Sequence, residues 1–144
     1  MPVAWMKADM LAYPLQTVTN TVNCVGAAGK GLALQFKRKF PANNKDYIEL
    51  CNRGEVKVGQ PYLFKGTTPW VLNFPTKRHW KDPSKIEWIE SGLAYLSENY
   101  KRWGIESLSI PKLGCGLGGL DWNLVKKLMY QELDQLDIIT IIHI

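Results

Sequence analysis

Two glycine-rich turns, each directly after an apolar segment, constrain this 144-residue chain more than any other feature. The first covers residues 24–31 (Cys-Val-Gly-Ala-Ala-Gly-Lys-Gly) and the second 114–119 (Gly-Cys-Gly-Leu-Gly-Gly). Glycine is favoured where the backbone needs a positive φ or approaches a ligand closely. A strand, a glycine turn and a helix in succession direct free N–H groups toward an anion. Two such turns therefore predict a ligand with a diphosphate.

Neither turn matches Gly-x-Gly-x-x-Gly or the Walker A pattern, which disfavours the usual dinucleotide-binding and P-loop folds. The alternative interpretation is that both turns are only tight connections between a strand and a helix. The concentration of glycine in two matched turns favours the ligand over this alternative.

The pattern between and around the turns is typical of an α/β domain, because short β-branched runs alternate with helical periodicities. We expect one domain over residues 1–144. Strands are expected at 3–7, 17–23, 61–64, 70–74, 107–110 and 138–144, and helices at 32–39, 42–53, 84–103 and 122–133.

The composition narrows the class of protein. The formal net charge is +5, and no apolar run approaches the roughly 20 residues that span a bilayer. The N-terminus lacks the apolar core of a signal peptide, so a cytoplasmic protein without membrane association is expected. Three widely spaced cysteines, Cys24, Cys51 and Cys115, argue against a disulfide framework and against a zinc site. We expect neither a metal ion nor a cofactor.

Two asparagines at the end of the second expected strand are candidate ligand-binding residues. Asn20 and Asn23 occur in Asn-Thr-Val-Asn, although asparagine is a poor strand residue. A carboxamide supplies donors and an acceptor for a sugar hydroxyl or a base edge. It can equally satisfy backbone groups in the following turn. We expect one role for each residue, without an assignment.

A basic segment follows the expected strand 70–74. It contains Lys77, Arg78 and His79 in a row, flanked by Phe74 and Trp80. Loops after the carboxyl ends of strands carry the ligand sites of α/β sheets. A point charge, a guanidinium fork and an imidazole suit an anionic or nucleobase-bearing substrate. A solvated basic loop is the alternative.

Taken together, these motifs resemble a macrodomain, the ADP-ribose-binding α/β fold with a three-layer α/β/α arrangement and a central mixed β-sheet. More narrowly, they resemble the DarG-type macrodomains of DarT–DarG toxin–antitoxin systems, which remove ADP-ribose from thymidine bases of DNA. The resemblance covers nearly the whole chain. It rests on the motifs at 20–23, 29–36, 53–56, 73–80 and 116–122, of which Asn-Phe-Pro-Thr-Lys at 73–77 is the most specific.

The resemblance implies roles for individual residues. Asp9 would contact the adenine amino group, and Lys77 and Asn23 would be catalytic. The two glycine turns would surround the diphosphate. The substrate-binding residues implied in this way are Asp9, Asn20, Gly26, Gly29, Lys30, Gly31, Thr76, His79, Gly114, Cys115, Gly116, Leu117, Gly118 and Gly119. The implied partners are ADP-ribose, ADP-ribosylated single-stranded DNA and a DarT-type toxin.

Two departures from the family pattern affect the expected function. Macrodomain glycohydrolases that act on protein glutamates carry a catalytic aspartate inside the second glycine turn, and Gly118 stands in that place here. Asp121 is better explained as a helix cap. This favours an antitoxin-type DNA ADP-ribosyl glycohydrolase over a hydrolase of glutamate-linked ADP-ribose. The chain also stops at Ile144, where DarG proteins commonly continue, so it is either a stand-alone hydrolase or an excised domain.

Other possibilities stay open at this stage. A non-catalytic ADP-ribose-binding module and an ADP-ribose 1″-phosphate phosphatase would share the fold. For a hydrolase, Lys77 can stabilise or protonate the leaving base, or its amine can attack the opened sugar. The sequence does not choose between these two routes.

Overall fold

The computed structural model describes residues 1–144 and contains one sheet with the strand order β1-β6-β5-β2-β4-β3. Neighbouring strands run parallel except β3, which pairs antiparallel with β4, so the sheet is mixed. All six expected strands form. Their bounds are β1 (Ala4–Met6), β2 (Thr17–Asn23), β3 (Tyr62–Phe64), β4 (Trp70–Lys77), β5 (Ser107–Pro111) and β6 (Ile139–His143).

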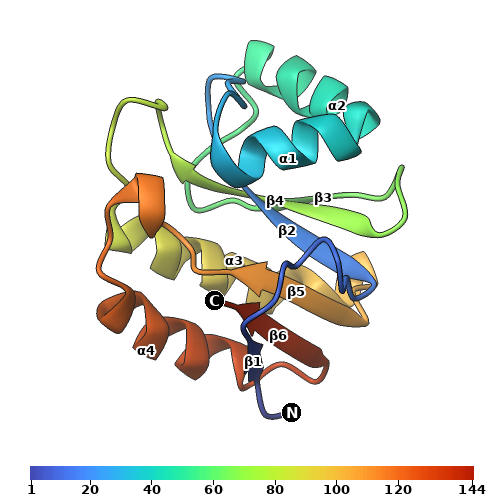
Figure 1. Ribbon diagram of the computed structural model, residues 1–144, viewed down its shortest axis with the longest axis vertical. Helices are drawn as coiled ribbons and strands as arrows, with labels where there is room; N and C mark the ends of the chain where they lie inside the picture. The colour runs from blue at the N-terminus through green and yellow to red at the C-terminus, as the bar shows by residue number, and fades with distance from the viewer.

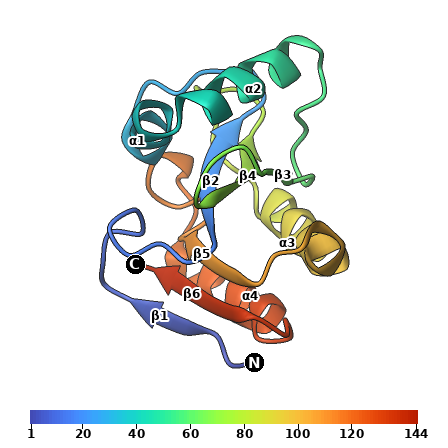
Figure 2. The same cartoon turned by 90° about the vertical axis from the view of Figure 1, so that its right-hand side faces the viewer.

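Four α-helices cover the sheet on both faces (Figures 1 and 2). They are α1 (Gly31–Lys39), α2 (Pro41–Asn52), α3 (Ile86–Trp103) and α4 (Trp122–Leu133). Helix α1 packs on α2 and β2, whereas α3 packs on α4 and β4. The three-layer α/β/α arrangement expected from the sequence is therefore confirmed. None of these helices has the length and apolar character needed to cross a membrane.

Strand β4 shows how the sheet supports a core on each face. Val71 packs in a cluster with Phe36 and Phe40 of the α1 side, and all three are buried. The next residue, Leu72, belongs with Phe74 to the larger cluster on the α3 and α4 side. Successive side chains of a strand point to opposite faces, so β4 needs apolar residues in succession.

The carboxyl ends of the parallel strands point toward one edge of the sheet, and the glycine turns follow there (Figure 1). Strand β4 runs to Lys77, beyond the expected 70–74, because β2 continues beside it and its register pairs Asn23 with Lys77. Helix α3 begins at Ile86 and not at residue 84. The Ser84 N–H instead donates to the Gly118 carbonyl at 2.9 Å, which holds the preceding loop against the second glycine turn.

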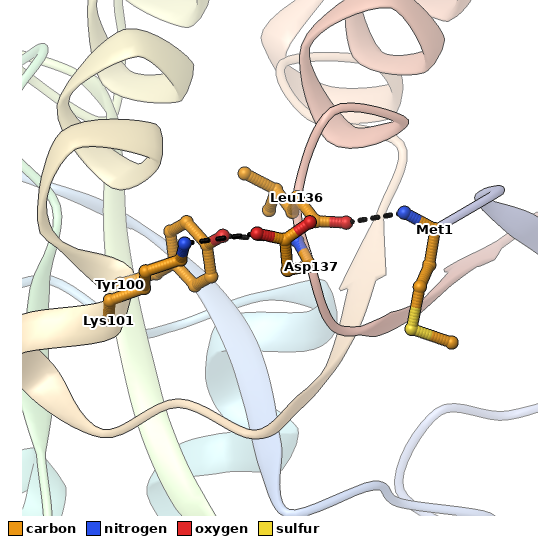
Figure 3. A network of polar contacts seen from close by, with 5 residues as sticks. All are labelled: Met1, Tyr100, Lys101, Leu136 and Asp137. Carbon is orange, nitrogen blue, oxygen red and sulfur yellow. Dashed lines mark hydrogen bonds and ion pairs between the residues drawn. The ribbon is translucent and has the colours of Figure 1, made fainter.

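At the amino ends of β1 and β6, polar contacts hold the N-terminus in place (Figure 3). The amino group of Met1 donates to the Leu136 carbonyl at 2.8 Å, and Lys101 pairs with Asp137 at 3.0 Å. The Asp137 N–H donates to the Tyr100 hydroxyl at 3.0 Å. These contacts connect the N-terminus and the end of α3 to the segment that leads into β6.

Gly92 lies inside α3, where replacement by alanine would be expected to stabilise the helix. Packing predicts the opposite, a loss of stability. A Cβ on Gly92 would lie 2.3 Å from Cζ of the buried Phe74 ring. Alanine is a better helix former than glycine by about 1 kcal/mol. Overpacking a core costs about 1–3 kcal/mol, and so short a contact places the cost near the upper end. After the gain in helix propensity is subtracted, we expect Gly92→Ala to lower the unfolding free energy by about 2 kcal/mol in urea denaturation.

The matched control is the double variant Gly92→Ala with Phe74→Leu. It should lose less stability than the two single variants added together, because the smaller side chain makes room for the new methyl group. A stabilised Gly92→Ala variant would contradict the close packing of α3 on β4.

Candidate functional site

The side chain of Asn23 organises the first glycine turn. Its Oδ1 accepts hydrogen bonds from the N–H groups of Val25 (3.1 Å) and Ala27 (3.2 Å), and its Nδ2 donates to the Ala27 carbonyl at 2.8 Å. The Tyr47 hydroxyl lies 2.8 Å from both Oδ1 and the main-chain oxygen of Asn23. Burial raises the pKa of Tyr47, so its hydroxyl keeps the proton that it donates. Asn23 thus fixes the backbone that leads to α1.

The N-terminus of α1 presents free backbone donors at the end of this turn. The amides of Gly31, Leu32 and Ala33 have no acceptor within the protein, and the first intrahelical bond is donated by Leu34 to the Lys30 carbonyl. No side chain caps the helix, and its first turn holds no acidic residue. Gly31 adopts a φ of +58° at the entry. The partial positive charge of the helix end is therefore available to an anion.

The second glycine turn presents further free donors beside the first. Within it, Gly118 donates to the Cys115 carbonyl at 3.3 Å and Gly119 to the Gly116 carbonyl at 3.1 Å, whereas the amides of Gly116 and Leu117 have no acceptor. A Cβ on Gly31 would lie 3.6 Å from Cδ1 of Leu117. The Leu117 side chain thus reaches the start of α1, so the two glycine turns are neighbours and each has free backbone amides, which are the donors that bind a diphosphate.

Gly118 has a packing role that the sequence does not predict. Its N–H and carbonyl are both bonded within the protein, and a Cβ there would lie 2.6 Å from the Oγ of Ser84. Gly118 is buried in this contact and allows the second turn to pack on the loop before α3. Its expected contact with the ligand stays a prediction, and the packing on Ser84 already accounts for a glycine at this position.

Lys77 lies at the carboxyl end of β4, opposite Asn23 in the register with β2. It is half-buried, and its Nζ donates to the Trp80 carbonyl at 3.3 Å. The Cys24 N–H donates to the Arg78 carbonyl at 3.2 Å, which joins the loops after β2 and β4. This contact fixes the position of Lys77 relative to the first glycine turn.

The residues beside Lys77 differ in accessibility. Thr76 is buried, so its expected contact with substrate stays a prediction. His79 is half-buried, and its Nδ1 accepts a hydrogen bond from the Lys81 N–H at 3.2 Å. This contact leaves Nε2 as the ring nitrogen that carries a proton in neutral His79.

Asn20 belongs to a cluster of buried asparagines that the sequence did not reveal. Its Nδ2 lies 3.4 Å from Oδ1 of Asn73, while Asn73 and Asn43 exchange two hydrogen bonds of 2.8 and 3.3 Å. Oδ1 of Asn20 is buried without a partner. The contact of Asn20 with substrate stays a prediction. Sequence analysis did not single out Asn43 and Tyr47 as residues that support the site. Both lie in α2, and they acquire their hydrogen-bond partners only when α2 packs on the sheet.

Asp9 lies in the turn after β1. Its Oδ1 accepts a hydrogen bond from the Leu11 N–H at 3.0 Å, and the residue is exposed. It lines a wide, open cavity of about 670 Å³ whose other walls include Lys112 and Trp122, on either side of the second glycine turn in the sequence. The aromatic ring of Trp122 lines the same cavity, with Nζ of Lys112 5.8 Å from its centroid. Sequence reasoning missed Trp122 and Lys112 as site residues, although both flank the second turn.

The sequence matches the Macro domain family over residues 19–129. The chain belongs to this family. The match includes both glycine turns and Lys77, whereas Asp9 lies before the matched segment.

Relatives of this macrodomain include proteins named as DNA ADP-ribosyl glycohydrolases and as DarG. A DNA ADP-ribosyl transferase–DNA ADP-ribosyl glycohydrolase fusion protein of Thermosipho africanus is 43% identical over 152 residues, covering 92% of this chain and 39% of the relative. The macrodomain of Mycobacterium tuberculosis DarG superposes with a TM-score of 0.93 at 39% identity, covering 98% and 96% of the two chains. Thermosipho africanus DarTG in complex with ADP-ribose gives a TM-score of 0.94 at 43% identity, covering 99% of this chain and 41% of that one.

The macrodomain thus spans about two fifths of the length of the first curated relatives, with 38–39% of each covered. Among the solved structures, the isolated macrodomain of Mycobacterium tuberculosis DarG is matched almost end to end. The likeness therefore concerns the macrodomain portion of the longer proteins.

The cysteines beside the glycine turns are protonated packing residues in this macrodomain. Burial raises the pKa of the Cys24 and Cys115 thiols above the ordinary value. A thiol that stays protonated at neutral pH is a poor nucleophile. The Sγ of Cys115 lies 3.6 Å from the Leu113 carbonyl, within its own loop. The expected contact of Cys115 with the ligand stays a prediction.

Proposed function

We propose that this macrodomain is an ADP-ribosyl glycohydrolase that removes ADP-ribose from thymidine bases of DNA and so reverses modification by a DarT-type toxin. The observation that carries the proposal is a pair of neighbouring glycine turns with free backbone amides, at the start of α1 and at Gly116 and Leu117, of which the first follows the end of β2 that pairs with Lys77. The relatives named as DNA ADP-ribosyl glycohydrolases support this substrate.

In this proposal, ADP-ribose binds along the carboxyl edge of the sheet. The diphosphate accepts hydrogen bonds from the free amides of both glycine turns. The adenine enters the cavity beside Asp9, whose second carboxylate oxygen accepts from the exocyclic amino group while Trp122 supplies an aromatic face. The distal ribose then extends toward Asn23 and Lys77. The Thermosipho africanus structure in complex with ADP-ribose supports this class of ligand.

The chemistry is the cleavage of an N-glycosidic bond. Its transition state carries oxocarbenium character at the ribose, while negative charge develops on the thymine. In one route the ammonium of Lys77 stabilises that charge and donates a proton to the leaving base. In the other route the neutral amine of Lys77 attacks the anomeric carbon of the opened ribose, the bond to thymine breaks and the protonated base leaves as the Schiff base forms, and water then hydrolyses the Schiff base to ADP-ribose and free Lys77. Asn23 positions the turn that holds the diphosphate, and in this way places the ribose carbon against Lys77.

A macrodomain that only binds ADP-ribose is the main alternative from another class of function. The position of Lys77 favours an enzyme, since it lies opposite Asn23 at the edge where the ligand turns meet. Binding of ADP-ribose alone needs only the amides and the Asp9 cavity.

A hydrolase of glutamate-linked ADP-ribose is the second alternative, and the second turn disfavours it. That turn offers no carboxylate, because Gly118 packs on Ser84, and Asp121 accepts from the Asn123 N–H at 3.0 Å as the cap of α4. We further propose that residues 1–144 act as one macrodomain unit in the cytoplasm, with a DarT-type toxin as functional counterpart.

The deciding experiment compares two substrates side by side. We expect release of free ADP-ribose from an oligonucleotide with one ADP-ribosylated thymidine, and release at least about tenfold slower from a glutamate-modified peptide, because the ester leaving group gives Lys77 no base to stabilise. Faster release from the peptide would overturn the assignment. Binding of ADP-ribose without release from either substrate would establish the non-catalytic alternative.

A further inference from the structure

The segment after Lys77 carries cations and tryptophans in mutual contact. We call Arg78, Trp80, Lys81, Lys85 and Trp88 the cationic–aromatic strip. Nζ of Lys81 lies 5.2 Å from the centroid of the Trp80 ring. The guanidinium carbon of Arg78 and Nζ of Lys85 lie 5.3 and 5.4 Å from the Trp88 ring. These contacts form two groups, Trp80 with Lys81 and Trp88 with Arg78 and Lys85, within the segment that leads from β4 into the first turn of α3.

Trp80 and the three cations of the strip are exposed, Trp88 is half-buried, and no ion pair neutralises the cations. Trp80 keeps 51% of its surface accessible, which is uncommon for so large an apolar ring. Both ion pairs of the protein lie elsewhere, so the acidic Asp82 and Glu87 of the same segment pair with none of the strip's cations. An exposed ring among unpaired cations is typical of a surface that binds a polyanion with π-faces.

The strip begins at the reacting end of the proposed site. The main-chain oxygen of Trp80 accepts the hydrogen bond from Nζ of Lys77, and the Arg78 carbonyl is tied to Cys24 of the first glycine turn. A strand of DNA whose modified thymidine meets Lys77 must leave the site on one side or the other. The strip lies directly along one of these paths.

We propose that the cationic–aromatic strip binds the single-stranded DNA next to the modified thymidine, with Trp80 stacking on the neighbouring base and Arg78, Lys81 and Lys85 contacting phosphates. This inference rests on the proposed function and extends it from the modified nucleotide to its flanking strand. Stacking on tryptophan tolerates any base, and the cations recognise only the backbone. The strip therefore adds affinity for single strands without sequence preference.

The test uses a second exposed tryptophan as a matched control. Trp5 resembles Trp80, since it is 55% exposed and has Nζ of Lys126 5.3 Å from its ring. It belongs to β1, however, which lies at the opposite end of the strand order from β4 and β3. Binding of an unmodified, labelled oligo-dT is measured by fluorescence anisotropy for the protein, Trp80→Ala and Trp5→Ala. We expect about tenfold weaker binding for Trp80→Ala and unchanged binding for Trp5→Ala.

Salt dependence and turnover complete the test. Lys81→Ala and Lys85→Ala should each lower the magnitude of the slope of log K against log salt by about 0.7, the single-strand value for one phosphate contact.

The kinetic test compares two substrates. The ratio of kcat/KM on a modified oligonucleotide to kcat/KM on the isolated modified nucleoside should fall about tenfold in Trp80→Ala. If this ratio and the binding of oligo-dT are both unchanged, the strip does not bind DNA, and the proposed function remains intact.

Two further outcomes separate the strip from the proposed function and from a protein partner. Oligo-dT binding that depends on Trp80, without release of ADP-ribose from any substrate, would support the strip and reject the proposed function. Polyglutamate that binds more tightly than oligo-dT, with the same dependence on Trp80, would show that the strip recognises an acidic protein and would overturn the proposal.

Discussion

Replacing Lys77 with alanine is expected to slow the release of ADP-ribose from modified thymidine by about 10²–10⁴-fold, the usual contribution of a positioned proton donor. Affinity for free ADP-ribose should change by less than about threefold, because the diphosphate and adenine are held by other groups. Single-turnover release and calorimetry with ADP-ribose measure the two quantities separately. Undiminished release would remove Lys77 from the mechanism.

Two further variants sharpen this result. Lys127→Ala removes an exposed lysine of α4 that makes no hydrogen bond or ion pair, and it should leave release unchanged. Lys77→Arg keeps the positive charge but lacks a nucleophilic amine. Partial activity in Lys77→Arg would favour stabilisation of the leaving base, whereas activity as low as that of Lys77→Ala would favour attack by the amine.

The strands and helices were predictable because their signals are local. The run Thr17–Asn23 was expected with the bounds that the structure shows, and Gly104 ends α3 in the left-handed conformation, as the sequence indicates. Asp121 caps α4 as predicted. In each of these cases residues adjacent in sequence determine the outcome.

The errors arose where a distant segment supplies the partner. The start of α3 is displaced because Ser84 bonds to Gly118, 34 positions along the chain, and β4 is lengthened because β2 continues beside it. The packing role of Gly118 depends on the same contact. No local pattern contains such information, since these bonds exist only after the turns have been brought to one edge of the sheet.

The individual site residues stay predictions, and the contacts that support them carried little signal in the sequence. Lys77, Asp9 and the two glycine turns stand at the carboxyl edge, where the motifs indicated a ligand. Tyr47 of α2 supports Asn23, but in the sequence it is only one of the aromatic or apolar residues of an expected helix. Nothing in the sequence indicates its contact with Asn23. Asn23 itself was expected either to bind the ligand or to satisfy the turn. Three of its side-chain hydrogen bonds go to the turn, while its expected catalytic role stays a prediction.

The second large effect is expected for Asn23→Ala. The change removes one side chain that accepts three hydrogen bonds and donates a fourth, so that the backbone of Val25 and Ala27 loses its partners. Each lost bond contributes about 0.5–1.5 kcal/mol, and the turn must then be ordered by the ligand itself. We expect ADP-ribose to bind about 10- to 100-fold more weakly, measured by calorimetry.

A matched variant separates support of the turn from contact with the substrate. Tyr47→Phe keeps the aromatic ring and leaves Asn23 in place, but it removes the hydroxyl that bonds to Oδ1 and to the main-chain oxygen. If Asn23 acts through the turn, Tyr47→Phe must weaken ADP-ribose binding in the same direction and by a smaller factor, with kcat little altered. If Asn23 instead acts on the reacting atoms, Asn23→Ala lowers kcat without weakening ADP-ribose binding, and Tyr47→Phe changes neither quantity.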